Sequence, residues 1–91
     1  MMDLTQAREA IDSLDREIAA LLARRFAVVD GVSDYKAAKG LPIHDPAREA
    51  QVIQRLRESL DEPYQADVAL LYERLFEISR ARQQHRRSSS N

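Results

Sequence analysis

The stretch that decides the fold is residues 4–39, which read LTQAREAIDSLDREIAALLARRFAVVDGVSDYKAAK. Its apolar residues recur in alternating steps of three and four, the spacing of a helix that packs along one seam. The seam consists of Leu4, Ala7, Ile11, Leu14, Ile18, Leu21, Val28 and Val32. The spacing predicts one long helix. Its weakest position is Gly31, because glycine costs about 1 kcal/mol relative to alanine inside a helix.

The residues at both ends of this stretch support the same helix. Asp3 is suited to cap the first turn, Glu9 complements the helix dipole, and Gly40 is suited to the position just past the end. A continuous helix of this length would span roughly 50 Å, whereas a compact chain of 91 residues has a radius of gyration of about 12 Å. The helix would therefore overhang its own domain, and its exposed seam predicts pairing with a second copy of the chain.

Three cations lie on or beside the seam. Arg25 takes the core position that follows Leu21, and a guanidinium there needs an anionic partner, because it cannot be neutralised and an unpaired buried charge is costly. Arg8 and Lys36 fall on the rim of the same stripe. For these two, a role in a site and a simple solvated position on the rim are both open.

Two further helices are predicted after a short loop. Asp45 followed by Pro46 is a helix start, and the apolar stripe behind it consists of Val52, Ile53, Leu56 and Leu60. Glu49 lies on the same face, either as an acid that complements the dipole or as an inward-facing group. Taken alone, Arg48 is expected to be solvated.

The third helix is expected to start at the turn 61–63 and to run to about His85. Its apolar ridge of Tyr72 and Phe76 continues into Ser79 and Gln83, so two uncharged polar residues share the inward face. Residues 86–91 are polar and rich in serine, and we expect a frayed or disordered tail there. The chain is thus predicted to be one all-α domain over residues 1–85, with a tail at 86–91.

Composition excludes several classes of function. Fourteen basic and fifteen acidic residues give a net charge of −1, which provides no general attraction to nucleic acid. There is no cysteine, and the two histidines, His44 and His85, are far apart in the sequence, so we expect no metal and no cofactor. Neither a signal peptide nor a membrane-spanning stretch is evident, which predicts a cytoplasmic protein without a membrane partner.

The polar residues expected on inward faces describe one mostly cationic pocket. They are Arg25 and Lys36 on the first helix, Arg48 and Glu49 on the second, and Ser79 and Gln83 on the third. Such a set suits a small dicarboxylate that also has a hydroxyl group. Arg8 lies seventeen residues before Arg25, about 25 Å along the helix, so it can approach Arg25 only across an antiparallel pair of chains.

These residues resemble the all-α chorismate mutases over about residues 4–84. The matching pattern is Arg8-Glu-x-Ile-x-x-Leu-Asp-x-x-Ile, Leu21-Leu22-x-x-Arg25, Lys36, Asp45-x-x-Arg48-Glu49 and Ser79-x-x-x-Gln83. The resemblance implies an intertwined three-helix homodimer that catalyses the Claisen rearrangement of chorismate to prephenate, at the branch toward phenylalanine and tyrosine.

The resemblance also implies a role for each site residue. Arg25 and the partner subunit's Arg8 would bind the two substrate carboxylates, and Arg48 would line the same side. Lys36, eleven residues after Arg25, would contact a carboxylate and the ether oxygen, to which Gln83 would donate. Asp45 and Glu49 would hold the ring hydroxyl, and Ser79 would assist a carboxylate. Gly31–Tyr35 and Arg80–Arg82 depart from the family pattern.

Two other functions compete with this one. An isochorismate pyruvate lyase resembles the same fold and uses much of the same cationic pocket, although the helix start at Asp45 and the amide of Gln83 favour the mutase. A non-catalytic helical dimerisation module would neutralise Arg25 with an acidic residue across the interface. A larger enzyme of the shikimate pathway, acting as an activator, is a further candidate partner.

Overall fold

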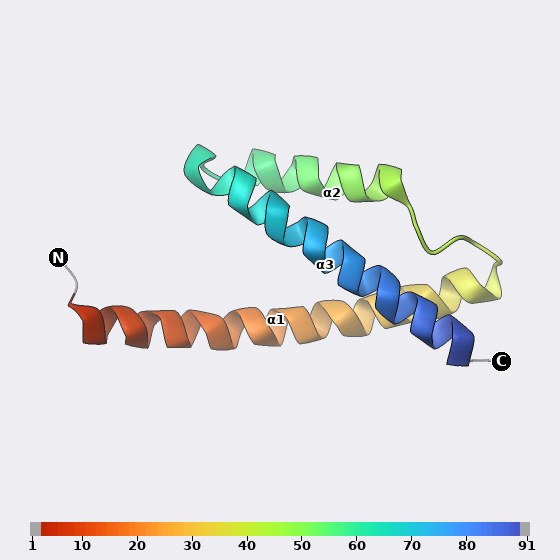
Figure 1. The fold of residues 1–91 in the computed structure, drawn as a ribbon, viewed down its shortest axis with the longest axis horizontal. Coiled ribbons are helices and arrows are strands. Elements are labelled where there is room, and N and C mark those ends of the chain that lie inside the picture. Colours follow the sequence, from red (N-terminus) through yellow and green to blue (C-terminus); the bar gives the residue numbers. More distant parts are fainter. Residues whose placement is uncertain (1–2, 90–91) are drawn as a thin grey trace.

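The computed structural model describes residues 3–89, which form three α-helices: α1 (Leu4–Ala38), α2 (Pro46–Ser59) and α3 (Glu62–Ser89). α3 packs against both α1 and α2, so it is the element that joins the other two (Figure 1). α2 and α3 form an antiparallel pair on one side of α1, and α3 crosses α1 near the C-terminal ends of both helices. The predicted all-α class is confirmed.

α1 is one continuous helix of 35 residues through Gly31. At its start the side chain of Asp3 accepts a hydrogen bond from the backbone N–H of Gln6 at 2.8 Å. At its end Gly40 has a φ of 66°, and the N–H of Leu41 donates to the carbonyl of Lys36 at 2.8 Å. This left-handed glycine closure stops the helix where the sequence predicted.

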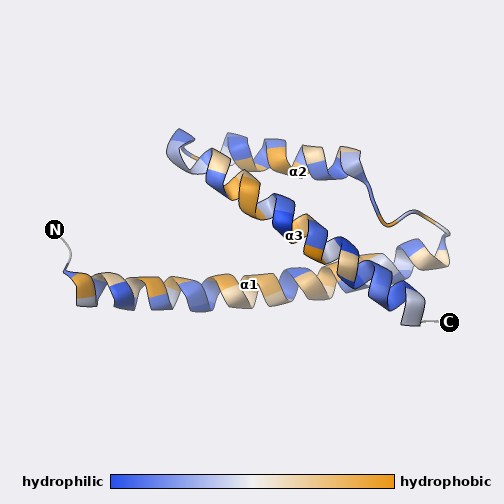
Figure 2. Ribbon diagram, viewed as in Figure 1, coloured by the Kyte–Doolittle hydropathy of each residue, from blue (hydrophilic) through white to orange (hydrophobic). Residues whose placement is uncertain are grey.

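The N-terminal half of α1 projects away from the other two helices (Figure 1). The molecule is 55 Å long, with a radius of gyration of 16.5 Å, whereas a compact chain of this length would have about 12 Å. Figure 2 shows apolar residues recurring along this free half, and the seam side chains there are exposed, with Leu4 at 64% and Leu14 at 55%. Within residues 3–89 no other segment covers this long apolar surface.

α2 starts and packs as predicted. Asp45 accepts a hydrogen bond from the backbone N–H of Arg48 at 3.1 Å, and Pro46 occupies the first turn. The stripe from Val52 to Leu60 is half-buried, on the helix that packs against α3. The N-terminus of α2 is thereby fixed beside the last half of α3.

The interior of the single chain is small and partly polar. Within residues 3–89 the buried apolar side chains are Ala69, Leu75 and Phe76, all on α3. The buried polar side chains are Ser33, Ser79 and Gln83. Buried polar groups need hydrogen-bond partners. The buried positions of Ser79 and Gln83 therefore indicate a polar site among the helices.

The C-terminal end differs from the expectation. α3 does not end near His85 but continues to Ser89, because ion pairs tie its last turns to α1: Arg82 lies 2.8 Å from Asp30, and Arg86 lies 2.6 Å from Asp34. The hydrogen bonds to Asp34 raise the pKa of Arg86. The remainder of the predicted tail, Ser90 and Asn91, lies outside the described residues.

In residues 3–89 no group of three or more His, Asp or Glu side chains is placed to hold a metal ion. None of the three helices in that range is long and apolar enough to cross a membrane.

Candidate active site

A cavity of about 220 Å³ lies where α1, α2 and α3 meet. Its polar lining consists of Arg25, Lys36, Asp45, Arg48, Glu49, Ser79, Arg80 and Gln83. Apart from Arg80, each residue of this set is one that the sequence pattern predicts or the family resemblance implies, and of these Ser79 and Gln83 come from α3. The structure thus brings together every predicted site residue except Arg8.

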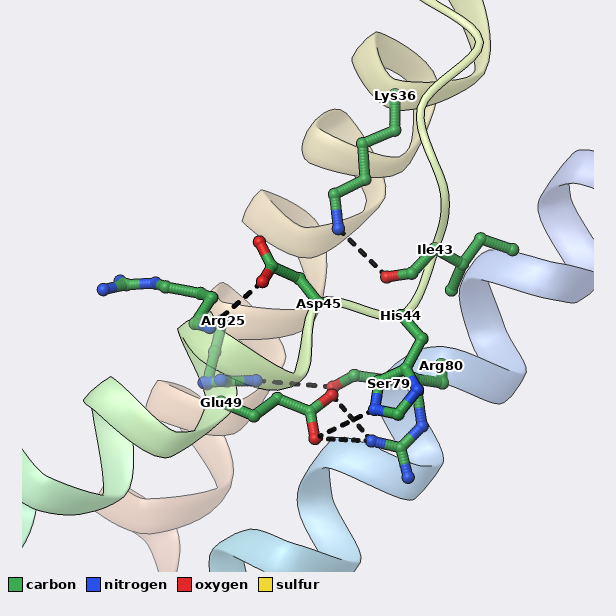
Figure 3. Close-up of polar contacts among 9 residues, drawn as sticks. Arg25, Lys36, Ile43, His44, Asp45, Glu49, Ser79 and Arg80 are labelled. Atoms are coloured by element: carbon green, nitrogen blue, oxygen red, sulfur yellow. Dashed lines mark hydrogen bonds and ion pairs between the residues drawn. The ribbon is translucent and has the colours of Figure 1, made fainter.

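Arg25 reaches this cavity from the middle of α1. Its Nη1 donates to the hydroxyl of Ser79 at 3.3 Å (Figure 3), and its guanidinium carbon lies 5.6 Å from the ring centre of Tyr72 and 5.8 Å from that of Phe76. None of the ion pairs within residues 3–89 includes Arg25. The anionic partner that the sequence requires is therefore not supplied by this part of the chain.

Lys36 lies at the other end of the cavity, near the C-terminus of α1. Its Nζ donates to the backbone carbonyl of Ile43 at 3.1 Å, which holds the loop between α1 and α2 against α1 (Figure 3). A lysine ammonium has three donors, so this bond leaves two for a ligand. Lys36 also makes no ion pair within residues 3–89.

The first turn of α2 supplies Asp45 and Arg48. One carboxylate oxygen of Asp45 is used to cap the helix. The guanidinium of Arg48 donates to the side chain of Gln51 at 2.7 Å, and the residue is exposed. Arg48 therefore lies on the exposed rim of the cavity, and its exposure agrees with the sequence-based expectation that it is solvated.

Glu49 has a partner that the sequence analysis missed. Nη1 of Arg80 lies 2.6 Å from each carboxylate oxygen of Glu49, and Nε2 of His44 lies 3.7 Å from one of them (Figure 3). The signal for Arg80 was its place directly after Ser79 and three residues before Gln83, which puts it beside the cavity-facing side of α3. Its pairing with a residue 31 positions away required the tertiary structure.

Ser79 and Gln83 line the cavity from α3. They are 5% and 7% exposed, respectively. The amide oxygen of Gln83 is buried without a hydrogen-bond partner. A buried polar atom in that state is costly, and such a cost is typical of a group kept for a ligand or a second chain.

Arg8 lies on the projecting half of α1, is exposed, and does not line the cavity. A second cavity, of about 530 Å³ and mostly apolar, lies between the middle of α1 and α3. Its lining includes Ile18, Leu21, Leu22, Leu71 and Leu75. Arg25 lines both cavities, so an apolar helix seated in the second would lie directly beside the first.

Comparison with known proteins identifies relatives of most of the chain. Residues 7–84 match the family model described as chorismate mutase type II. The chain is 36% identical over 55 residues to a chorismate mutase from Methanocaldococcus jannaschii, an alignment that covers 60% of this chain and 56% of that protein. It is 39% identical over 59 residues to a T-protein from Enterobacter agglomerans, covering 65% of this chain and 16% of that protein.

A bifunctional chorismate mutase/prephenate dehydratase from Aquifex aeolicus is 33% identical over 64 residues, which is 70% of this chain and 18% of that protein. The chain thus matches between about one sixth and just over half of the length of these relatives. No solved structure is significantly similar to it. Because the family model spans nearly all of the three helices that surround the polar cavity, the chain belongs to the chorismate mutase type II family.

Proposed function

We propose that this chain is a chorismate mutase, which converts chorismate to prephenate for the synthesis of phenylalanine and tyrosine. The observation that carries the proposal is the cavity shared by the three helices, in which Arg25 and Lys36 have no carboxylate partner within residues 3–89. Four cationic and two anionic side chains line it, an excess of two positive charges. That excess matches a substrate with two carboxylates.

The reaction is an intramolecular rearrangement in which a carbon–oxygen bond of the ether breaks while a carbon–carbon bond forms. It needs no nucleophile and no proton transfer. The protein must hold the flexible side chain of the substrate over the ring and stabilise the negative charge that develops on the ether oxygen. Fixed cations and amide donors in a small cavity can do both.

We assign the roles as the family pattern suggests. Arg25 and the partner subunit's Arg8 bind the two carboxylates, with Ser79 and Arg48 assisting. Lys36 and Gln83 donate to the ether oxygen from two different helices, α1 and α3. The hydroxyl of Ser79 already accepts from Arg25, so it can orient the guanidinium, and Asp45 and Glu49 remain for the ring hydroxyl.

The proposal includes a homodimer. The projecting half of α1 has an exposed apolar seam, and the cavity of about 530 Å³ offers an apolar surface next to Arg25. A second copy seated there in the antiparallel direction covers both surfaces and brings its Arg8 toward Arg25, with two equivalent sites related by two-fold symmetry. The cytoplasmic location predicted from the sequence remains part of this proposal.

The direct test is to incubate the purified protein with chorismate and, separately, with isochorismate, and to identify the products by NMR. Prephenate from chorismate is the expected result. Pyruvate from isochorismate as the main product would replace the mutase with a lyase. Turnover of neither substrate, by a folded and dimeric protein, would contradict an enzymatic role for the chain acting alone.

A further inference from the structure

We propose that Arg80 is a positioning residue of this site: it holds the carboxylate of Glu49 where that group accepts the ring hydroxyl of the substrate, and so contributes to recognition of a hydroxylated ring. This inference rests on the proposed function. It concerns a residue whose pairing with Glu49 is made by the tertiary structure, 31 positions apart in the chain.

The geometry of the pair supports a positioning role. One nitrogen, Nη1 of Arg80, lies 2.6 Å from both oxygens of Glu49. The side chains of Arg80 and Glu49 are 30% and 24% exposed, so solvent screens the pair only in part. Within residues 3–89 it is the one ion pair that joins α2 to α3. The contact therefore fixes both a side chain and the distance between two walls of the cavity.

Glu49 needs such a partner because several other polar groups compete for it. The imidazole of His44 lies 3.7 Å away from one carboxylate oxygen, and Lys36 and Arg48 line the same cavity. If the carboxylate of Glu49 moved toward Lys36 or Arg48, it would neutralise a cation that is needed to bind the substrate. A carboxylate has about four lone-pair positions, so the contact with Arg80 leaves Glu49 able to accept a hydroxyl.

The alternative is that Arg80 itself binds a substrate carboxylate. To do so its guanidinium would have to leave Glu49, which would then be a partly buried carboxylate without its strong partner, and this is costly. Arg25 and Lys36 can bind a substrate carboxylate without breaking an ion pair, because neither is in an ion pair within residues 3–89. Arg80 is therefore better suited to support Glu49, and Arg25 and Lys36 are better suited to bind the substrate.

The experiment measures kcat/KM for chorismate and for an analogue that lacks the ring hydroxyl. The proteins are the wild type, Arg80→Met, Arg80→Lys, Glu49→Gln and the double variant, with Arg57→Met on the exposed face of α2 as the control. A hydrogen bond to a charged group predicts that the wild type prefers chorismate over the analogue by about tenfold or more. We expect Arg80→Met to reduce this preference at least about threefold, and Arg80→Lys to restore part of it.

The double variant separates support of Glu49 from direct contact with substrate. If Arg80 acts through Glu49, adding Arg80→Met to Glu49→Gln changes the preference little. Additive losses would show a direct contact and overturn the inference, and so would an equal loss on both substrates, which indicates a purely structural role. If the wild type is active and Arg80→Met shows the same preference for chorismate as the wild type, this inference alone is overturned. If the wild type is folded but inactive, the proposed function is overturned as well.

Discussion

Arg25 on α1 donates to the hydroxyl of Ser79 on α3 at 3.3 Å, and this contact lies at the boundary between the polar and the apolar cavity. The distance is at the long end for a hydrogen bond to oxygen, so the bond is weak. A carboxylate that enters the polar cavity can therefore draw the guanidinium toward itself at little cost. The contact sets the direction of Arg25 without consuming its charge.

Replacing Arg25 with Met tests this arrangement. Methionine keeps apolar contact with Tyr72 and Phe76 but cannot bind an anion, and loss of one charged ligand of this kind is expected to lower kcat/KM for chorismate by about 10²–10³. The free energy of unfolding should stay the same or rise, because a cation without a carboxylate partner is removed. Enzyme kinetics and thermal unfolding measure the two quantities.

The matched control is Arg24→Met, at the neighbouring exposed arginine of α1. It should retain the wild-type rate. An Arg25→Met variant as active as this control would exclude Arg25 from substrate binding.

Replacing Gln83 with Glu should create a pH dependence that the wild type lacks. An amide donates a hydrogen bond at any ordinary pH, whereas a carboxyl donates only when protonated, and its unperturbed pKa is about 4.3. Burial of the position acts to raise the pKa of the introduced carboxyl, and the cations that line the cavity act to lower it. The activity of the variant should be present below that pKa and fall about tenfold per pH unit above it.

The measurement is kcat/KM from pH 4 to 8, an interval of about four units around and above the pKa of a carboxyl group. Gln84→Glu, at the neighbouring exposed glutamine, is the control and should follow the wild-type profile. Full activity of Gln83→Glu at the alkaline end would remove the assignment of Gln83 as the donor to the ether oxygen.

Subunit mixing tests whether Arg8 acts across an interface. Arg8→Ala and Arg25→Ala homodimers should each be nearly inactive. After exchange of subunits at equal concentrations, about half of the dimers are mixed and each of these contains one intact site, so about a quarter of the wild-type activity should return.

Recovery of activity is followed over time after mixing, and the oligomeric state is measured by analytical ultracentrifugation. If both arginines acted from the same chain, no mixed dimer could contain an intact site and activity would stay at the level of the single variants. A monomeric, fully active protein would also contradict the shared site.

The two glycines should respond to alanine with opposite signs. Gly31 is inside α1, and a Cβ built there meets nothing within 4 Å, so Gly31→Ala should raise the free energy of unfolding by up to about 1 kcal/mol. Gly40 has a φ of 66°. Gly40→Ala should lower the free energy of unfolding by about 1 kcal/mol or more, because an L-residue is strained in that conformation. Thermal or urea unfolding gives both values.

A fall in stability for Gly31→Ala would mean that another surface approaches this glycine in solution. Dependence of that fall on protein concentration would identify the surface as a second copy of the chain. No change for Gly40→Ala would show that the loop tolerates a different helix ending.

The helical architecture could be predicted from local sequence because each signal acts over a few residues. The heptad from Leu4 to Val32, the caps at Asp3 and Asp45, and the stop at Gly40 depend on hydrogen bonds and steric limits within one or two turns. The end of α3 could not be predicted in this way. It depends on Arg82 and Arg86 reaching Asp30 and Asp34, some 52 residues earlier in the chain.

The site divides along the same line. The sequence alone determined which side chains face inward, because helical periodicity fixes the face of Arg25, Ser79 and Gln83, and family resemblance supplied the other members. Only the tertiary structure decided that Glu49 pairs with Arg80, that Lys36 holds the loop at Ile43, and that Arg25 has no acidic neighbour within residues 3–89. These relationships join residues on different helices, and their distances follow from how α3 crosses α1 and α2, which no local pattern encodes.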